Sequence, residues 1–156
     1  MRTHNDVMVD GGTALFRVVR FWSRRWASGV QPAAGGEAAH VAQVLVLEAI
    51  DAAGGDDGTA QIAEVAAELG LDRSNASRMV AAAVRAGLVT KTVSGQDARR
   101  TEVSLTAAGQ EMLTAAHDWQ AETFAQLTAG WPSADVRRFS SYLARLAGPG
   151  IPQEQP

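Results

Sequence analysis

The sequence predicts a mainly helical fold with a small β-hairpin, of the α+β class. Three observations predict it. Over most of the chain, apolar residues recur at three- and four-residue spacing, which is the pattern of helices that bury one face. Two short segments between residues 88 and 105 are instead rich in β-forming residues and flank a turn. Two of the helical segments are separated only by a glycine-containing turn, as in a helix-turn-helix.

Composition limits the class of protein. The chain has 156 residues, of which 46% are hydrophobic and 20% charged, so one globular domain is expected. No apolar run approaches the roughly 18 residues of a membrane helix, and residues 1–12 lack the pattern of an export signal. We therefore expect a cytoplasmic protein that does not bind membranes. The absence of cysteine excludes disulfides and thiolate zinc sites.

The first third of the chain predicts two helices. One covers residues 13–28, after an arm of little pattern at 1–12, and a connector with proline and paired glycines follows at 29–36. The other covers residues 37–53 and ends in the glycine-rich loop 54–58. The apolar stripe of the first helix consists of Leu15, Val18, Val19, Trp22 and Trp26.

The middle of the chain predicts the helix-turn-helix. Its first helix covers residues 62–69 and is ended by Gly70. Asp72 is a favourable N-cap for the second helix, residues 73–86, which Gly87 ends. This second helix therefore presents its N-terminal turn directly after a short turn of the chain.

The hairpin and two further helices follow. The strands are predicted at 88–93 and 101–105, with the turn at 94–97. Thr106 caps a long helix that runs to about residue 129, and Ser133 caps a last helix that runs to residue 147. The final residues, 151–156, form a polar tail.

Positive charge is concentrated in one segment. Between residues 73 and 100 the net charge is about +5, although the whole chain has a net charge of −3. The charged residues of this segment are Arg73, Arg78, Arg85, Lys91, Asp97, Arg99 and Arg100. A phosphate responds to charges within a Debye length of roughly 10 Å, so the local charge decides whether nucleic acid is attracted.

Three motifs follow one another in the same region. Ser77-Arg78 lie in a helix that ends in Ala86-Gly87-Leu88-Val89, Asp97-Ala98-Arg99 lies in the hairpin, and Val103-Ser104-Leu105-Thr106-Ala107-Ala108-Gly109 comes next. In order and spacing they resemble the S-R…x-G-L-V, D-x-R and V-x-L-T-x-x-G motifs of the MarR family of bacterial transcriptional regulators. The resemblance extends to residue 147. It implies a winged helix-turn-helix, with the hairpin as the wing, flanked by N- and C-terminal dimerisation helices.

The chain departs from the family pattern at two positions. Gln61 stands where the family usually has a serine or threonine cap, and Ala83 stands where it usually has leucine. Both positions concern helix initiation and packing, so the departures bear on local stability more than on DNA binding.

The N-terminal turns of helix 73–86 hold the candidate base-reading residues. A recognition helix fits the roughly 12 Å wide major groove and offers mainly its N-terminal side chains to the bases. These are Ser74, Asn75, Ser77 and Arg78. Arg78 can pair bidentately with guanine, and Asn75 suits adenine. The alternative is an ordinary polar helix face on which Ser74 and Asn75 support the cap.

The hairpin supplies the second candidate contact. The resemblance implies that Arg99 enters the minor groove, where narrow A·T-rich DNA has an enhanced negative potential. Asp97 would then orient the wing, because phosphates repel a carboxylate. Arg73, Lys91 and Arg100 are candidate phosphate contacts. The alternative is a set of solvated charges on an exposed turn.

One such module makes few base contacts, so specificity usually requires two. The first and last helices carry more apolar surface than a small core needs, which together with the resemblance predicts a homodimer that reads a pseudo-palindromic operator in double-stranded DNA. Packing within the chain is the alternative. We expect a single domain over residues 1–150, with a winged helix-turn-helix lobe at 37–106 and dimerisation helices at 13–30 and 110–147.

The family resemblance also implies a small-molecule pocket between the dimerisation helices and the lobe. Phe16, Trp22, Trp26 and Trp119 are candidates to line it and to stack on a planar aromatic effector. The alternative, which we favour for each of these residues, is a place in the hydrophobic core.

Neither a metal nor another cofactor is expected. Glu37, His40 and His117 come from helices that meet in this fold, and some relatives sense zinc with such residues. The chain has only three histidines, no close histidine pair and no cysteine, so a structural role for these histidines is favoured.

The sequence thus predicts a non-enzyme, because P-loop, G-x-S-x-G, H-E-x-x-H and G-x-G-x-x-G signatures are all missing. We expect a sequence-specific DNA-binding transcriptional regulator, acting as a homodimeric repressor that a small-molecule effector releases. The alternative is a winged-helix protein–protein interaction module without DNA binding. Such a module would not require the basic segment 73–100.

Overall fold

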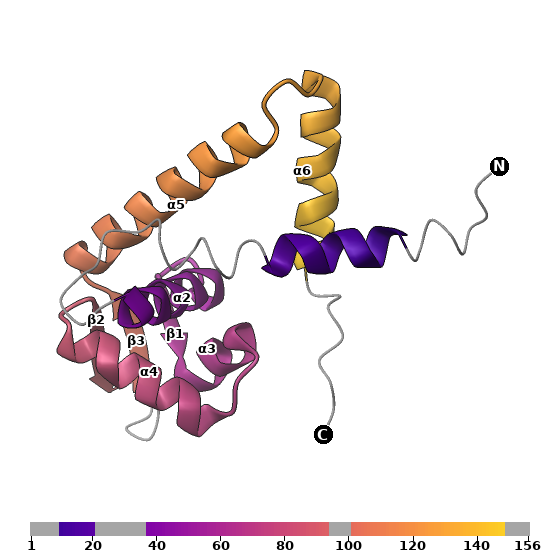
Figure 1. Ribbon diagram of the computed structural model, residues 1–156. Helices are drawn as coiled ribbons and strands as arrows, with labels where there is room; N and C mark the ends of the chain where they lie inside the picture. Colours follow the sequence, from indigo (N-terminus) through magenta and orange to yellow (C-terminus); the bar gives the residue numbers. More distant parts are fainter. Residues whose placement is uncertain (1–9, 21–36, 94–100, 149–156) are drawn as a thin grey trace.

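The fold consists of a lobe of helices and short strands, from which two further helices extend (Figure 1). The computed structural model describes residues 10–20, 37–93 and 101–148. The lobe contains α2 (Glu37–Ala53), β1 (Thr59–Gln61), α3 (Ile62–Leu69), α4 (Arg73–Arg85), β2 (Val89–Val93) and β3 (Thr101–Leu105). The long helix α5 (Ala107–Leu127) leads away from it to α6 (Ser133–Ala147). The predicted mainly helical class with a small hairpin is confirmed.

Helix α2 is the centre of the lobe. It contacts α3, α4, α5, β1 and β3. Its fully buried Val44, Leu47 and Ile50 recur at three-residue spacing, which places them on one helical face. The neighbouring elements contribute Val65, Val80, Ala83, Val103 and Leu113 to the same core. Burying one side chain of this size contributes roughly 1.5–3 kcal/mol, so packing on α2 holds the lobe together.

The turn between α3 and α4 is built as the sequence predicts. Gly70 adopts the left-handed conformation at φ 62°, which a residue with a side chain rarely does, and ends α3. Asp72 caps α4, because its Oδ1 accepts a hydrogen bond from the backbone N–H of Asn75 at 2.9 Å. At the start of α3, the N–H of Gln61 donates to Glu64 Oε2 at 2.7 Å, which is the half of a capping box that does not depend on a serine or threonine.

The sheet has one strand more than the sequence predicts. Strand β3 lies between β1 and β2 and pairs antiparallel with both. Val103 of β3 is opposite Ala60 of β1 and Lys91 of β2, and its side chain is buried. The missed strand β1 spans only three residues, which is too short for an alternating pattern to be recognised.

The N-terminus of α5 is locked to the corner between α4 and β2. The Thr106 hydroxyl accepts a hydrogen bond from the N–H of Gly109 at 3.1 Å and donates one to the carbonyl of Gly87 at 2.7 Å. The N–H of Thr106 donates to the carbonyl of Leu88 at 3.0 Å. Gly109 lies so close to the same carbonyl that a Cβ atom there would be 2.1 Å from the Leu88 oxygen. The threonine and glycine of the V-x-L-T-x-x-G motif are thereby explained.

Helix α6 starts differently from the prediction. Its N-cap is Pro132, not Ser133, which is the first helical residue. The Pro132 carbonyl accepts hydrogen bonds from the N–H groups of Asp135 and Val136. The predicted cap was one residue wrong because serine is the commoner capping residue, whereas here a carbonyl alone serves the first turn.

The apolar faces of the outer helices are exposed. Residues 10–20 are helical, including 10–12, which the sequence pattern assigned to an arm; residues 21–28 of the predicted helix lie outside the described ranges. Phe16 is 65% exposed, and Tyr142 and Leu146 of α6 are 59% and 52% exposed. Phe139 of α6 packs on Phe124 at 5.9 Å between ring centroids, but no residue of α6 is buried. These faces therefore lack cover within the described part of the chain.

Among the described residues, no helix has the length and apolar character needed to span a membrane.

Replacing Gly109 by alanine should disrupt the corner between α5 and β2. The added methyl would meet a backbone oxygen, which can move only with the strand, so we expect a loss of about 3 kcal/mol in the free energy of unfolding, the upper end of the usual cost of overpacking. Chemical denaturation measures it. Gly55→Ala is the matched control, because nothing lies within 4 Å of its Cβ position. Equal stabilities of the two variants would contradict the proposed contact.

Candidate nucleic-acid interface

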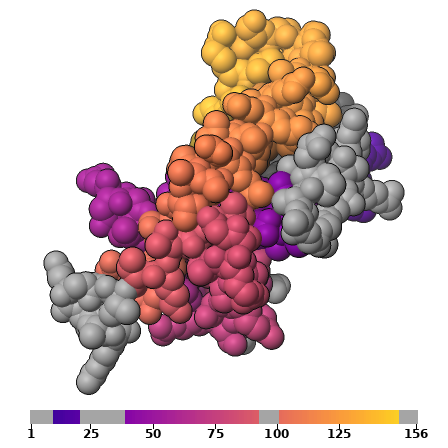
Figure 2. All heavy atoms as spheres, turned by 90° about the vertical axis from the view of Figure 1, so that its left-hand side faces the viewer, coloured from indigo at the N-terminus to yellow at the C-terminus, as the bar shows by residue number. Residues whose placement is uncertain are grey.

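Helix α4 has a buried side and a polar side. Ala76, Val80 and Ala83 are buried against the lobe core. The predicted base-reading residues lie elsewhere on the helix: Ser74 and Arg78 are exposed, and Asn75 and Ser77 are half-buried. In Figure 2 the atoms of the segment 73–93, pink on the bar, lie at the surface of the lobe below α5. The polar side is therefore accessible to a large partner.

A chain of hydrogen bonds joins three polar side chains at the start of α4. Asp72 Oδ2 accepts from the side-chain amide nitrogen of Asn75, and the Asn75 amide oxygen accepts from an Nη atom of Arg78. The three residues are spaced three apart, so they are neighbours on one side of the helix. The sequence points to Asn75 and Arg78 as separate readers of bases and does not reveal that they are joined.

Asp72 is ionised under ordinary conditions. Hydrogen bonds from the Asn75 backbone and then from its side chain lower the pKa of Asp72 below the ordinary value of 3.8. Both hydrogen bonds favour the ionised form, because a carboxylate is a better hydrogen-bond acceptor than a carboxylic acid. The negative charge lies at the N-terminus of α4, where the helix dipole also favours it.

The remaining predicted contacts are described only in part. Arg73 is exposed at the first position of α4, and Lys91 is exposed on β2. Asp97, Arg99 and Arg100 lie outside the described residues, so their predicted roles in the wing remain predictions. In the described part of the hairpin, β2 ends at residue 93 and β3 begins at residue 101.

The predicted effector residues are not brought together in the described part of the chain. Phe16 is exposed and Trp119 of α5 is half-buried, while Trp22 and Trp26 lie outside the described residues. The aromatic pocket thus remains a prediction.

Two polar side chains on α2 have buried atoms that the sequence analysis did not single out as unpaired. His40 is only 6% exposed, and both of its ring nitrogens lack a hydrogen-bond partner. The side-chain oxygen of Gln43, one turn along the helix, also lacks one. Buried polar atoms are usually paired, so these three atoms need a water or a ligand as their partner. Their signal in the sequence is a histidine and a glutamine within the otherwise apolar stretch 38–47 of α2.

The suggested metal ligands are not clustered. His40 is buried, whereas His117 of α5 is exposed. Glu37 begins α2, but its side chain is not among those described. Within the described ranges, no three histidine, aspartate or glutamate side chains are placed to hold a metal ion together.

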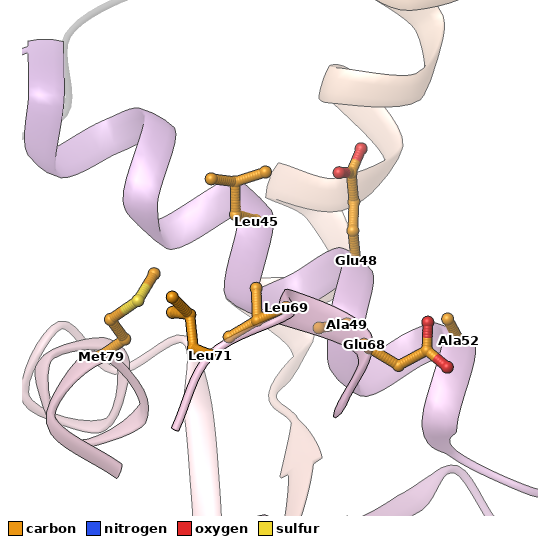
Figure 3. Close-up of a pocket in the computed structure, with 8 residues that line it drawn as sticks. All are labelled: Leu45, Glu48, Ala49, Ala52, Glu68, Leu69, Leu71 and Met79. Atoms are coloured by element: carbon orange, nitrogen blue, oxygen red, sulfur yellow. The ribbon is translucent and has the colours of Figure 1, made fainter. Parts of the chain in front are cut away.

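An apolar hollow of about 400 Å³ lies between α2, the end of α3 and α4 (Figure 3). Leu45, Leu69, Leu71 and Met79 supply most of its lining, and Glu48 and Glu68 also border it. Glu48 Oε1 accepts a hydrogen bond from Gln120 of α5 at 2.6 Å. None of the predicted effector residues lines this hollow.

The geometry defines a winged helix-turn-helix: α3 and α4 form the two helices, and β2 and β3 form the strands of the wing. Residues 40–100 match the model of the MarR family. Over these residues the chain matches the MarR family, and the resemblance inferred from the three motifs is confirmed. No curated protein sequence matches the chain.

Solved structures share the fold over most of the chain. A MarR family protein from Bacillus stearothermophilus superposes with a TM-score of 0.74 at 14% identity, covering 93% of this chain and 96% of its own. MarR from E. coli in its apo form gives 0.65 at 21% identity, covering 86% and 95%. BpsR of Bordetella bronchiseptica, whose DNA binding is regulated by 6-hydroxynicotinic acid, gives 0.64 at 18% identity, covering 88% and 97%. At these identities, the likeness establishes the fold.

Acid should weaken the start of α4. Since the pKa of Asp72 is lowered in the folded state, its carboxylate stabilises the fold above the ordinary value of 3.8, and this contribution disappears as the pH falls through the lower folded value. The difference in unfolding free energy between the wild type and Asp72→Ala should therefore be constant from about pH 5 to 7 and shrink below about pH 4. Denaturant titrations at each pH measure it. Ser74→Ala, which removes no titrating group, should show no such trend.

Proposed function

We propose that this protein is a sequence-specific regulator of transcription that binds double-stranded DNA, and that it acts in the bacterial cytoplasm as a homodimeric repressor. The observation that carries the proposal is the exposed polar side of α4, where Ser74 and Arg78 are accessible, together with the two strands β2 and β3 that follow it in the chain. A helix N-terminus with short polar side chains and an arginine matches the needs of major-groove reading. The family match of residues 40–100 supports the same role.

The distribution of charge supports binding to phosphates. Arg73, Arg78, Arg85 and Lys91 are all exposed on the described part of the segment, whose sequence is basic although the chain is acidic overall. Phosphate contacts of this kind position a protein on the duplex without reading its sequence. We assign this role to Arg73, Lys91 and Arg100, and the minor-groove contact to Arg99, with Asp97 orienting the wing.

A dimer accounts for the uncovered apolar faces. Helix 10–20 and α6 expose five large apolar or aromatic side chains: Leu15, Phe16, Val18, Tyr142 and Leu146. Exposed apolar faces of this kind are typical of an interface that a second copy of the chain buries. We propose that segments 13–30 and 110–147 form this interface and that the lobe 37–106 is attached to it. Two lobes related by a twofold axis would then read a pseudo-palindrome.

An effector would act on the spacing of the two lobes. In BpsR, 6-hydroxynicotinic acid regulates DNA binding. We propose a planar aromatic effector here as well, in a pocket to which Phe16, Trp22, Trp26 and Trp119 contribute. The unpaired ring nitrogens of His40 and the oxygen of Gln43 support a polar ligand near α2. Such a ligand would favour dimer geometries in which the recognition helices do not match the operator.

Loss of the arginine contacts should weaken DNA binding in two distinguishable ways. Fluorescence anisotropy against the operator should show that Arg99→Ala weakens binding to all duplexes, whereas Arg78→Ala costs about tenfold and also relaxes preference at particular base pairs. The wild-type affinity should fall by about a thousandfold between roughly 50 and 200 mM salt, as expected for six or more phosphate contacts. Arg138→Ala, on exposed α6, is the control that should change neither quantity.

The competing function, a winged-helix module that binds proteins only, predicts different results. A protein that shows no salt-dependent binding to duplex DNA, with or without these substitutions, would favour that module and end the present proposal.

The dimer is tested on α6. Leu146→Asp places a charge in the middle of the exposed apolar face and should shift the protein from dimer to monomer in sedimentation velocity at micromolar concentration. Ser141→Asp adds the same charge on the opposite side of the helix and should leave the dimer intact. A monomeric wild type, or a Leu146→Asp variant that remains dimeric, would show that another surface is used.

A further inference from the structure

The cap of the recognition helix does more than start the helix. Asp72 uses both carboxylate oxygens on Asn75, one for the backbone N–H at 2.9 Å and one for the side-chain amide. A serine or threonine cap provides a single oxygen and would serve only the backbone. The second bond is therefore a feature of aspartate at this position, and it has a consequence for the next side chain.

The three hydrogen-bonding groups fix one another's orientation. An ionised carboxylate can only accept hydrogen bonds, and a guanidinium can only donate them. The amide of Asn75 does both, so its nitrogen must face Asp72 and its oxygen must face Arg78, as the structure has it. The reversed amide would place its N–H groups against the guanidinium and its oxygen against the carboxylate, which is repulsive at both ends. Because the pKa of Asp72 is lowered, this arrangement persists at neutral pH.

We infer that Asp72 and Asn75 are positioning residues for Arg78, and that Arg78, rather than Asn75, is the base reader on this side of α4. The inference rests on the proposed DNA-binding function. Adenine readout by asparagine needs its amide plane aligned with the base edge, and in Asn75 the hydrogen bonds to Asp72 and Arg78 fix the direction of that plane. Arg78 donates one of its five N–H groups to Asn75, and the remaining N–H groups are enough for a bidentate contact with guanine.

Holding Arg78 in place before DNA arrives should raise discrimination more than affinity. A flexible arginine can adapt to several base edges or turn to a phosphate, whereas a held guanidinium meets one edge in one geometry. The wrong base then leaves its donors unpaired in a desolvated groove. We call the hydrogen-bonded chain from Asp72 through Asn75 to Arg78 the relay. Its effect should be largest at the single base pair that Arg78 contacts.

The test separates the relay from the helix cap. Asp72→Ser keeps an N-capping oxygen but removes the acceptor for the Asn75 side chain. The operator is first selected from randomised duplexes with the wild-type protein. The affinity of each variant is then measured for that operator, for its single-base-pair variants and for a scrambled duplex. At the base pair that Arg78→Ala relaxes, Asp72→Ser and Asn75→Ala should each lower discrimination about threefold to tenfold. Their affinity for the scrambled duplex should not fall.

Two controls sharpen this result. Removing a carboxylate near DNA strengthens binding to any duplex, and Glu68→Gln, which removes an exposed carboxylate from α3, measures that charge effect alone. In the double variant Asp72→Ser/Arg78→Ala, the loss at the Arg78 base pair should be no larger than in Arg78→Ala, since the relay acts only through this arginine.

A measurement without DNA tests the relay directly. The side-chain amide signals of Asn75 in ¹H–¹⁵N spectra of the free protein should shift as Asp72 titrates, with a midpoint below 3.8, and this response should vanish in Asp72→Ser. An Asn75 side chain that does not sense Asp72 would overturn the relay, whatever the protein binds.

The DNA results have equally clear readings. If Arg78→Ala relaxes one base pair while Asp72→Ser and Asn75→Ala leave the preference profile unchanged, the relay is wrong and the DNA-binding function stands. If Asn75→Ala relaxes a separate A·T pair, Asn75 is itself a reader and the inference is also wrong. A wild type that binds every duplex equally would instead remove the sequence-specific function.

Discussion

The close approach of Gly109 to the carbonyl of Leu88 is the constraint on which the rest of the fold depends. It brings the first turn of α5 onto the corner where α4 ends and β2 begins, and Thr106 ties the same corner to Gly87. The recognition helix, the wing and the long helix therefore leave one small junction in fixed directions. This junction is made largely of backbone atoms, and α2, which contacts both α4 and α5, forms a second connection between the two helices.

Much of this fold follows from local patterns. The bounds of α2 and β3 agree with the prediction, because a long apolar period and a run of β-forming residues are strong signals. The three-residue strand β1 was missed, since its existence depends on pairing with β3 rather than on its own sequence. Pro132 in place of Ser133 at the start of α6 shows the same limit, because neighbouring residues compete for one cap.

The candidate site was only partly predictable. The helical period was enough to place Ser74 and Arg78 on the exposed side of α4, and their contact with DNA stays a prediction. The pairing of Asn75 with both Asp72 and Arg78 depends on rotamers that no spacing rule determines. Similarly, an apolar stripe such as that of α6 predicts that a helix face is buried, but it does not identify the surface that buries it. The buried nitrogens of His40 illustrate the same point inside the lobe.

Lys91 is a single site for amine-directed labelling of a side chain in this protein. It is the only lysine in the sequence, it is exposed on β2 beside the wing, and the chain has no cysteine. Once α-amino groups, which as a class have a lower pKa than lysine side chains, have been blocked near neutral pH, an amine-directed fluorophore applied at higher pH would therefore label Lys91 on strand β2. In the proposed dimer, the distance between two such labels would test whether the separation of the wings changes as ligands are added, without an engineered attachment point.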